Sequence, residues 1–296
     1  MSRYSRDDDR ANEVERFLHR EPLRSHKVRN NDLDEDHLTR GLALPHGDER
    51  EIVAFRDREY SLNGSEARAL AAVGAFRAVD VSDLEHGADA FHGDWRSLRE
   101  QGLLTHETLT DRNGARHVVA LTRDGKDLLD THAASRSDGR QQAYYAGIVK
   151  PRELAHDARL YGAYKEEAAR IEREGGRVTR VVLDYELKRD YQKFLNRDDR
   201  PDDATLDRDR ATFAAVNDLK VIHGHLELPD LRIEYVDEDG RLEHRDVELL
   251  TEHYSRGQLA GKSRAGFTCY RAAGRRGGGQ SRRGDTPFDP RILERL

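Results

Sequence analysis

The apolar residues change from a helical spacing to a spacing of two near residue 103, and this change is the strongest constraint on the fold of the chain. Residues 103–110 and 115–122 alternate between apolar and polar side chains, and they flank the sequence Asp-Arg-Asn-Gly. An Asn-Gly pair between two alternating runs is the signal of a tight β-turn. We therefore predict a β-hairpin at this point of the chain.

The segments around this hairpin have the apolar spacing of short amphipathic helices. A helix is predicted at 65–76, where Ser65 would be the cap, and two more at 79–87 and 89–102, each ended by a glycine. A further helix at 123–132 follows the hairpin. A winged helix-turn-helix has three helices, a hairpin and a closing helix in this order. We therefore expect a winged helix-turn-helix over residues 59–132.

A winged helix often binds double-stranded DNA, with its third helix in the major groove and its hairpin against the backbone or minor groove. The residues that we expect to contact DNA lie on the third helix and at the hairpin tip: His92, Arg96, Arg99, Gln101, Arg112 and Arg116. Three acids on the same helix, Asp89, Asp94 and Glu100, reduce its positive charge. The alternative is that this unit binds proteins or dimerises.

Residues 151–270 carry helical and strand patterns in turn and predict a second domain. The predicted elements are a helix (152–176), a strand (177–188), a charged excursion (189–210), a helix that could end in a strand (211–225), a hairpin (228–252) and a helix (255–267). This order predicts a small mixed sheet with flanking helices, so that the whole chain belongs to the α+β class.

The remaining segments have no clear apolar period. We expect residues 1–58 to be polar and flexible, residues 133–150 to be a linker, and residues 271–296 to be an Arg/Gly-rich tail with a short terminal helix.

The hairpin at 228–252 carries two acids, Asp230 and Glu248, where a core strand would favour Val or Leu. Asp230 follows a proline at the mouth of the first strand, and Glu248 alternates with apolar neighbours on the second. Two carboxylates that converge from adjacent strands suit Mg²⁺, and Lys262 on the next helix would stabilise the charge of a phosphodiester transition state. We predict Asp230 and Glu248 as Mg²⁺ ligands; the alternative is that both are ordinary solvated strand residues.

This arrangement resembles the PD-(D/E)xK, or restriction-endonuclease-like, fold, which places an Asp after a Pro on one strand and a Glu, one residue, then a Lys on the next. Here Leu250 stands in the usual Lys position. The resemblance implies that Lys262 takes that role, as in members that carry the lysine on the following helix. It also implies an outer acid on the long helix, for which Glu167 is the candidate and Glu166 the less favoured alternative.

Over roughly residues 60–270 the chain is also similar to the replication-relaxation family of plasmids and other mobile elements. The segments that carry the resemblance are 97–129, 156–168, 228–235 and 247–267. The resemblance implies a winged helix joined to a degenerate nuclease-like domain, acting on DNA in replication, relaxation or mobilisation. The family usually has an acid where this chain has Leu250, so the second domain is expected to be either a Mg²⁺-dependent endonuclease or inactive. The alternative function is a winged-helix transcriptional regulator or accessory factor with a non-catalytic second domain.

Composition limits the partners and the compartment. The net charge of −6 neither supports nor excludes a DNA partner, because the tail from residue 271 holds seven Arg. One cysteine, no apolar run long enough for a bilayer and no signal peptide lead us to expect a cytoplasmic protein without a membrane partner. Residues 257–263 fall one residue short of a phosphate loop, so no nucleotide cofactor is expected. A homodimer is a candidate assembly.

Overall fold

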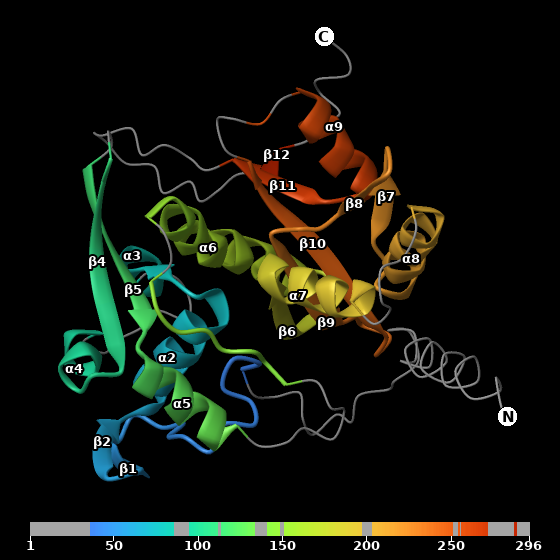
Figure 1. Ribbon diagram of the computed structural model, residues 1–296. Coiled ribbons are helices and arrows are strands. Elements are labelled where there is room, and N and C mark those ends of the chain that lie inside the picture. Colours follow the sequence, from blue (N-terminus) through green and yellow to red (C-terminus); the bar gives the residue numbers. More distant parts are fainter. Residues whose placement is uncertain are drawn as a thin grey trace, which may run out of the picture.

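The chain folds into helices and small sheets of the α+β class, which confirms the predicted class (Figure 1). The computed structural model describes residues 36–85, 95–111, 114–133, 141–148, 151–196, 203–250, 254, 256–271 and 287–288. Within these ranges, no helix is both long enough and apolar enough to cross a membrane.

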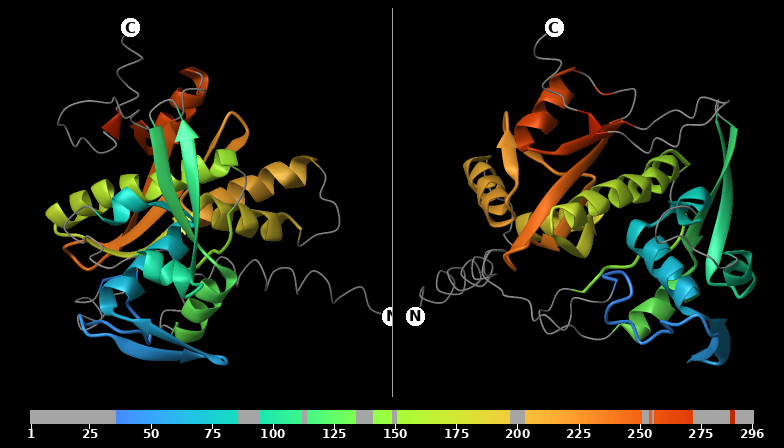
Figure 2. Two further views of the ribbon diagram at one scale, coloured as in Figure 1. Left: turned by 90° about the vertical axis from the view of Figure 1, so that its left-hand side faces the viewer. Right: turned by 180° about the vertical axis from the view of Figure 1, so that it is seen from behind.

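The first unit contains an N-terminal hairpin, a three-stranded sheet and short helices. Its elements are β1 (Glu51–Phe55), β2 (Arg58–Leu62), α2 (Gly64–Phe76), β3 (Val79–Asp80), α3 (Val81–Leu84), α4 (Trp95–Glu100), β4 (Leu104–Asp111), β5 (Gly114–Leu121) and α5 (Arg123–His132). The three-stranded sheet has the order β3-β5-β4, with antiparallel pairs throughout. The predicted hairpin is therefore confirmed, and β4 with β5 forms a long arm, which can be followed from three sides in Figure 1 and Figure 2.

Local side-chain contacts explain where two of these helices begin. The cap of α2 is Asn63 and not Ser65: the Asn63 side chain accepts from the Glu66 backbone N–H, and the Glu66 side chain accepts from the Asn63 N–H. This reciprocal capping box satisfies two donors at the start of the helix. Thr122 caps α5 through the backbone N–H of Gly125, at the position that the sequence predicts.

The second unit is a five-stranded mixed sheet with helices on both faces. Its elements are α6 (Pro151–Arg173), β6 (Arg177–Leu183), α7 (Asp184–Leu195), α8 (Asp203–Val216), β7 (Lys220–Ile222), β8 (His225–Glu227), β9 (Leu231–Val236), β10 (Leu242–Leu250), α9 (Arg256–Ala265), β11 (Thr268–Arg271) and β12 (Pro287–Phe288). The strand order is β12-β11-β10-β9-β6. Strand β9 is antiparallel to both of its neighbours, β6 and β10, whereas β11 is parallel to β10, and α9 connects these two strands.

The two faces of this sheet differ in polarity. Val247 and Leu249 belong to the main apolar core together with Ile171 of α6, so α6 covers this face. The opposite face carries buried or half-buried charged side chains, which include the bidentate pair of Arg232 with Asp246 at 2.7 and 2.8 Å. The alternation predicted for β10 is therefore present.

Three predicted elements of this unit differ from the structure. The strand predicted at 177–188 ends at Leu183, and α7 begins at Asp184. The charged excursion contains most of α7 and the start of α8, because Phe194 of α7 and Phe213 of α8 bury against each other in a separate apolar cluster. The helix predicted at 211–225 ends at Val216, and its last residues form β7 and the turn of the short β7–β8 hairpin, where Gly224 has a φ of 79°.

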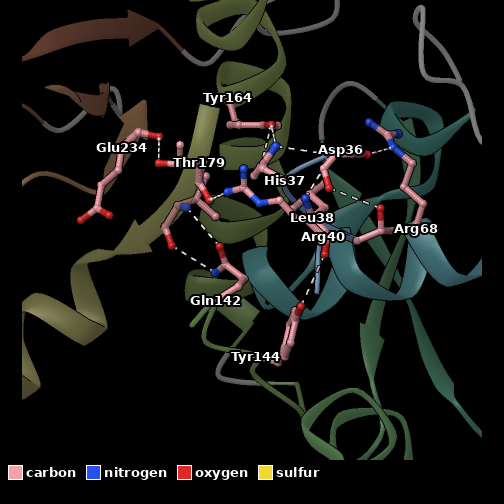
Figure 3. A network of polar contacts seen from close by, with 12 residues as sticks. Asp36, His37, Leu38, Arg40, Arg68, Gln142, Tyr144, Tyr164, Thr179 and Glu234 are labelled. Carbon is pink, nitrogen blue, oxygen red and sulfur yellow. Dashed lines mark hydrogen bonds and ion pairs between the residues drawn. The ribbon is translucent and has the colours of Figure 1, made fainter. Parts of the chain in front are cut away.

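The two units share one apolar core, and segments expected to be flexible lie between them. Phe76 of α2 packs against Tyr161 and Tyr164 of α6, with ring centroids 5.1 and 4.9 Å apart. Figure 3 shows the polar contacts at this junction, where Arg40 donates to the Thr179 carbonyl at 3.1 Å and Tyr164 lies 3.0 Å from the Nε2 of His37.

These contacts correct part of the predicted domain boundaries. Residues 36–58 are ordered against the core, and residues 51–58 form β1 and the start of β2, so the first unit begins before residue 59. In the predicted linker, Tyr144 is buried in the same core, and Gln142 bonds both backbone groups of Val181. The predictions for residues 1–35, 134–140, 272–286 and 289–296, the last of which include the short terminal helix, lie outside the described residues.

Candidate functional site

The mouth of the β9–β10 hairpin brings together the three residues that the sequence singles out. Asp230 lies directly before β9, Glu248 lies in β10 and Lys262 lies in α9. Lys262 Nζ is 3.2 Å from Glu248 Oε1, and the Asp230 backbone N–H donates to Glu248 Oε2 at 3.3 Å. In return, the Leu249 backbone N–H donates to Asp230 Oδ2 at 2.8 Å. The predicted cluster of two acids and one lysine is therefore present in space.

Lys262 is held at this point by several acceptors. Its ammonium group donates to the Leu228 carbonyl at 2.9 Å and lies 3.3 Å from Glu227 Oε2. Burial disfavours its charge, but Glu248 and Glu227 outweigh burial and raise the pKa of Lys262. The lysine is thus a fixed positive charge beside the acids.

Glu248 is the most perturbed acid of the cluster. Its side chain is 2% exposed, and burial together with the negative charge of Asp230 raises its pKa to about 7, against the partial opposition of Lys262. Tyr254 donates its hydroxyl to Glu248 Oε1 at 2.6 Å. A carboxyl group with this pKa can exchange a proton near neutral pH, which is the property required of a general acid or base.

His156 of α6 is a member of the cluster that the sequence reasoning missed. Its Nε2 lies 3.2 Å from Asp230 Oδ2, and its Nδ1 lies 3.6 Å from Asp157 Oδ1. Burial opposes protonation, but the hydrogen bonds to Asp157 and Asp230 outweigh it and raise the pKa of His156 to about 10. Asp157 also pairs with Arg77 of the first unit at 3.4 Å. A chain of ion pairs therefore connects the end of α2 to Asp230.

Glu167 does not lie in the cluster. The prediction that Glu167 is the outer acid of this site is therefore wrong. Its carboxylate accepts from Arg245 at 2.7 Å and from the Tyr270 hydroxyl at 2.5 Å. Arg245 and Glu248 are three residues apart in β10, so their side chains leave opposite faces of the sheet. Glu167 is thus a fully buried acid on the α6 face, where its partners balance its charge.

The cluster contains two carboxylates that lie side by side, those of Asp230 and Glu248. Among the described residues, no group of three or more His, Cys, Asp or Glu side chains is placed to hold a metal ion. Mg²⁺ commonly takes one or two carboxylates and completes its shell with water and substrate oxygens. Burial and the negative charge of Asp230 raise the pKa of Glu248, and a divalent cation would relieve the repulsion between the two acids.

A second candidate surface lies on α4 and the β4–β5 arm of the first unit. The guanidinium groups of Arg96 and Arg99 lie over the Trp95 ring, 4.8 and 5.6 Å from its centroid, and both side chains are exposed. This geometry holds two positive charges on the outer side of α4. Two of the predicted DNA contacts, His92 and Arg112, lie outside the described residues.

The structure does not bring the other two predicted DNA contacts to this surface. The Gln101 side chain bonds both backbone groups of Ser61, at 2.8 and 3.2 Å, and so anchors the β1–β2 hairpin. Arg116 pairs with Leu109 in the arm, whereas His117 pairs with Thr108. Side chains of consecutive strand residues leave opposite faces, so Arg116 lies on the face opposite His117.

Comparison with known proteins gives no relative from which a role could be transferred. No family model matches the chain, and neither a curated protein nor a solved structure matches it.

Proposed function

We propose that the protein binds double-stranded DNA through its first unit and acts on phosphodiester bonds at the acidic cluster of its second unit. The first unit would be a winged helix, and the second would be a small sheet of the PD-(D/E)xK type. The resemblance to the replication-relaxation family supports a role in the replication, relaxation or mobilisation of a plasmid or other mobile element.

The order of elements in the first unit supports DNA binding. Helix α2, strand β3, helices α3 and α4 and the β4–β5 arm follow one another as in a winged helix, with α4 in the place of the third helix. Arg96 and Arg99 point outward from that helix. Exposed arginines on a short helix beside a projecting hairpin suit contacts to the phosphate backbone and to base edges.

The position of Lys262 against Glu248 is the observation that carries the catalytic part of the proposal. Three side chains from separate segments meet there, although the strand lacks the usual lysine at Leu250. Asp230 and Glu248 would hold Mg²⁺, which would neutralise phosphate charge and lower the pKa of a bound water. Lys262 would stabilise the negative charge that develops on the phosphate, and His156 would keep Asp230 oriented toward the cluster.

Nicking of supercoiled plasmid DNA in the presence of Mg²⁺ tests this function. We expect the wild-type protein to produce open-circular DNA, and we expect Glu248→Gln and Lys262→Met each to reduce the rate by roughly a hundredfold or more, as for the loss of a charge-stabilising group. Equal nicking by wild type and both variants would contradict the catalytic assignment. Glu227→Gln is a matched control. It removes an acid that contacts Lys262, and it leaves the side chains of Asp230, Glu248 and Lys262 unchanged.

The hydrogen bonds of the acidic pair favour a second candidate function. Each acid accepts a backbone N–H from the other strand, and Tyr254 and Lys262 bind the remaining oxygen of Glu248. Such a pair can close the mouth of the hairpin without any chemistry, in a regulator or accessory factor with a non-catalytic second unit. DNA retardation without nicking, together with no divalent-cation binding, would support this second function.

A further inference from the structure

Two histidines on the β4–β5 arm form a contact that the proposed function does not use. His106 Nε2 lies 3.0 Å from His117 Nδ1, and the two rings stack with centroids 5.2 Å apart. His106 also stacks on the buried ring of Trp95, with centroids 4.9 Å apart. The rings of Trp95, His106 and His117 are therefore stacked in series. Trp95 is buried in the core under α4, and the side chain of His117 is exposed.

The charges around this histidine pair are mainly positive. Arg96 and Arg99 of α4 lie over Trp95 and act on His106, and burial, His117 and these arginines lower the pKa of His106. Glu107, the next residue of β4, acts in the opposite direction. Its side chain and that of Arg116 on β5 belong to the other face of the arm. The side that carries the pair thus gathers two guanidinium groups and two imidazoles.

The short contact between the rings limits how many protons the pair can hold. One ring nitrogen must donate and the other must accept, so the bonded pair is compatible with at most one added proton. With a second proton, both facing nitrogens would carry N–H groups and would repel each other. An anionic oxygen beside the two rings would accept from both N–H groups and would remove this conflict.

We infer that His106 and His117, together with Arg96 and Arg99, form a phosphate-binding site whose occupation by the DNA backbone is accompanied by proton uptake. This inference depends on the proposed DNA binding of the first unit and adds the chemistry of its contact. A ligand that favours the protonated pair binds more tightly as the pH falls. Affinity for DNA should therefore rise between about pH 8 and about pH 6, by up to tenfold per pH unit for each proton taken up.

Fluorescence anisotropy with a labelled duplex and the full chain tests this site. Affinity is measured at several pH values at constant ionic strength, with EDTA in every reaction so that no metal ion bridges the imidazoles. His117→Gln removes the exposed ring of the pair and is expected to flatten the pH dependence. His117→Arg supplies a permanent charge and is expected to bind tightly at every pH, with the same flat profile. His225→Gln, at an exposed histidine of β8, is the matched control and should keep the wild-type slope.

The outcomes separate this inference from the proposed function. If the wild type binds the duplex with the same affinity at all pH values, or if His117→Gln keeps the wild-type slope, the histidine site is wrong while DNA binding stands. If the wild type binds no DNA at low salt at any pH, the proposed DNA-binding function itself is wrong.

Discussion

Asp230 and Glu248 are joined across the open end of the β9–β10 hairpin, where the backbone N–H of Asp230 donates to Glu248 Oε2 at 3.3 Å. This contact explains why a hairpin with one apolar face carries two acids: each acid satisfies a backbone donor of the neighbouring strand. The same contact holds two negative charges close together. Lys262 and His156 offset only part of the repulsion between these two carboxylates. Ionisable side chains whose pKa is shifted by burial and by neighbouring charges are typical of functional sites.

Replacement of Glu248 by Gln should stabilise the metal-free protein at neutral pH and above. The folded state raises the pKa of Glu248 from 4.5 to about 7, so between these values the folded state binds more protons than the unfolded state. Stability therefore falls as the pH rises through this window, by up to about 3 kcal/mol. Gln mimics the protonated form and removes this loss.

Urea unfolding in EDTA at about pH 5 and about pH 7 measures this effect, because this range covers the window of Glu248 and lies mostly below the range in which His156 loses its stabilising charge. The wild type should lose stability between the two values, and Glu248→Gln should lose much less and be the more stable protein at the higher pH. If the variant is instead clearly less stable at both pH values, the acidic pair acts mainly as a structural clamp.

Replacement of Glu167 should leave nicking unchanged, because this acid lies on the face of the sheet opposite Glu248. Glu167→Gln keeps a hydrogen-bond acceptor for Arg245 and Tyr270. We expect its nicking rate to stay within about twofold of wild type, since it removes no group from the transition state. A loss comparable to that of Glu248→Gln would restore Glu167 as a member of the site.

Removal of Arg96 or Arg99 should weaken DNA binding in a salt-dependent way. Each phosphate contact contributes about one unit to the slope of log affinity against log salt, so each Ala variant should reduce the slope by about that amount. Arg116→Ala, which changes the same charge on the other face of the arm, is the control. Equal effects of all three substitutions would show that the arm does not bind DNA on the α4 side.

Gln101→Ala serves as a second comparison in the same titrations. Because Gln101 binds the backbone of Ser61, we expect lower stability but an unchanged salt slope, as measured by thermal unfolding and by anisotropy.

Removal of the His156 charge should strengthen divalent-cation binding. A protonated imidazole 3.2 Å from Asp230 Oδ2 competes with a cation for the same oxygen. His156→Gln should therefore tighten Mn²⁺ binding by roughly five- to tenfold, a modest fraction of the Coulomb energy of a close pair. Unchanged affinity would show that His156 and the cation do not share Asp230.

The sequence predicts elements with a strong local pattern and misses those that depend on distant contacts. The β4–β5 arm, α6 and the β9–β10 hairpin follow from their apolar periods and turn residues, and Lys262 is correctly placed near the acids. Helix α7 escapes notice among charged residues, although Leu187, Tyr191 and Phe194 have helical spacing. His156 meets Asp230 across 74 residues, and no local pattern in the sequence signals such a pair.

Direct titration with a divalent cation is the closest test of the central claim, that Asp230 and Glu248 form a cation site beside Lys262. Isothermal titration calorimetry with Mg²⁺, and electron paramagnetic resonance with Mn²⁺ as a tighter-binding probe, would be done on the wild type, Asp230→Asn and Glu248→Gln. We expect the wild type to bind a cation saturably and both variants to lose this binding. No saturable binding by the wild type, or binding that survives both substitutions, would contradict this claim.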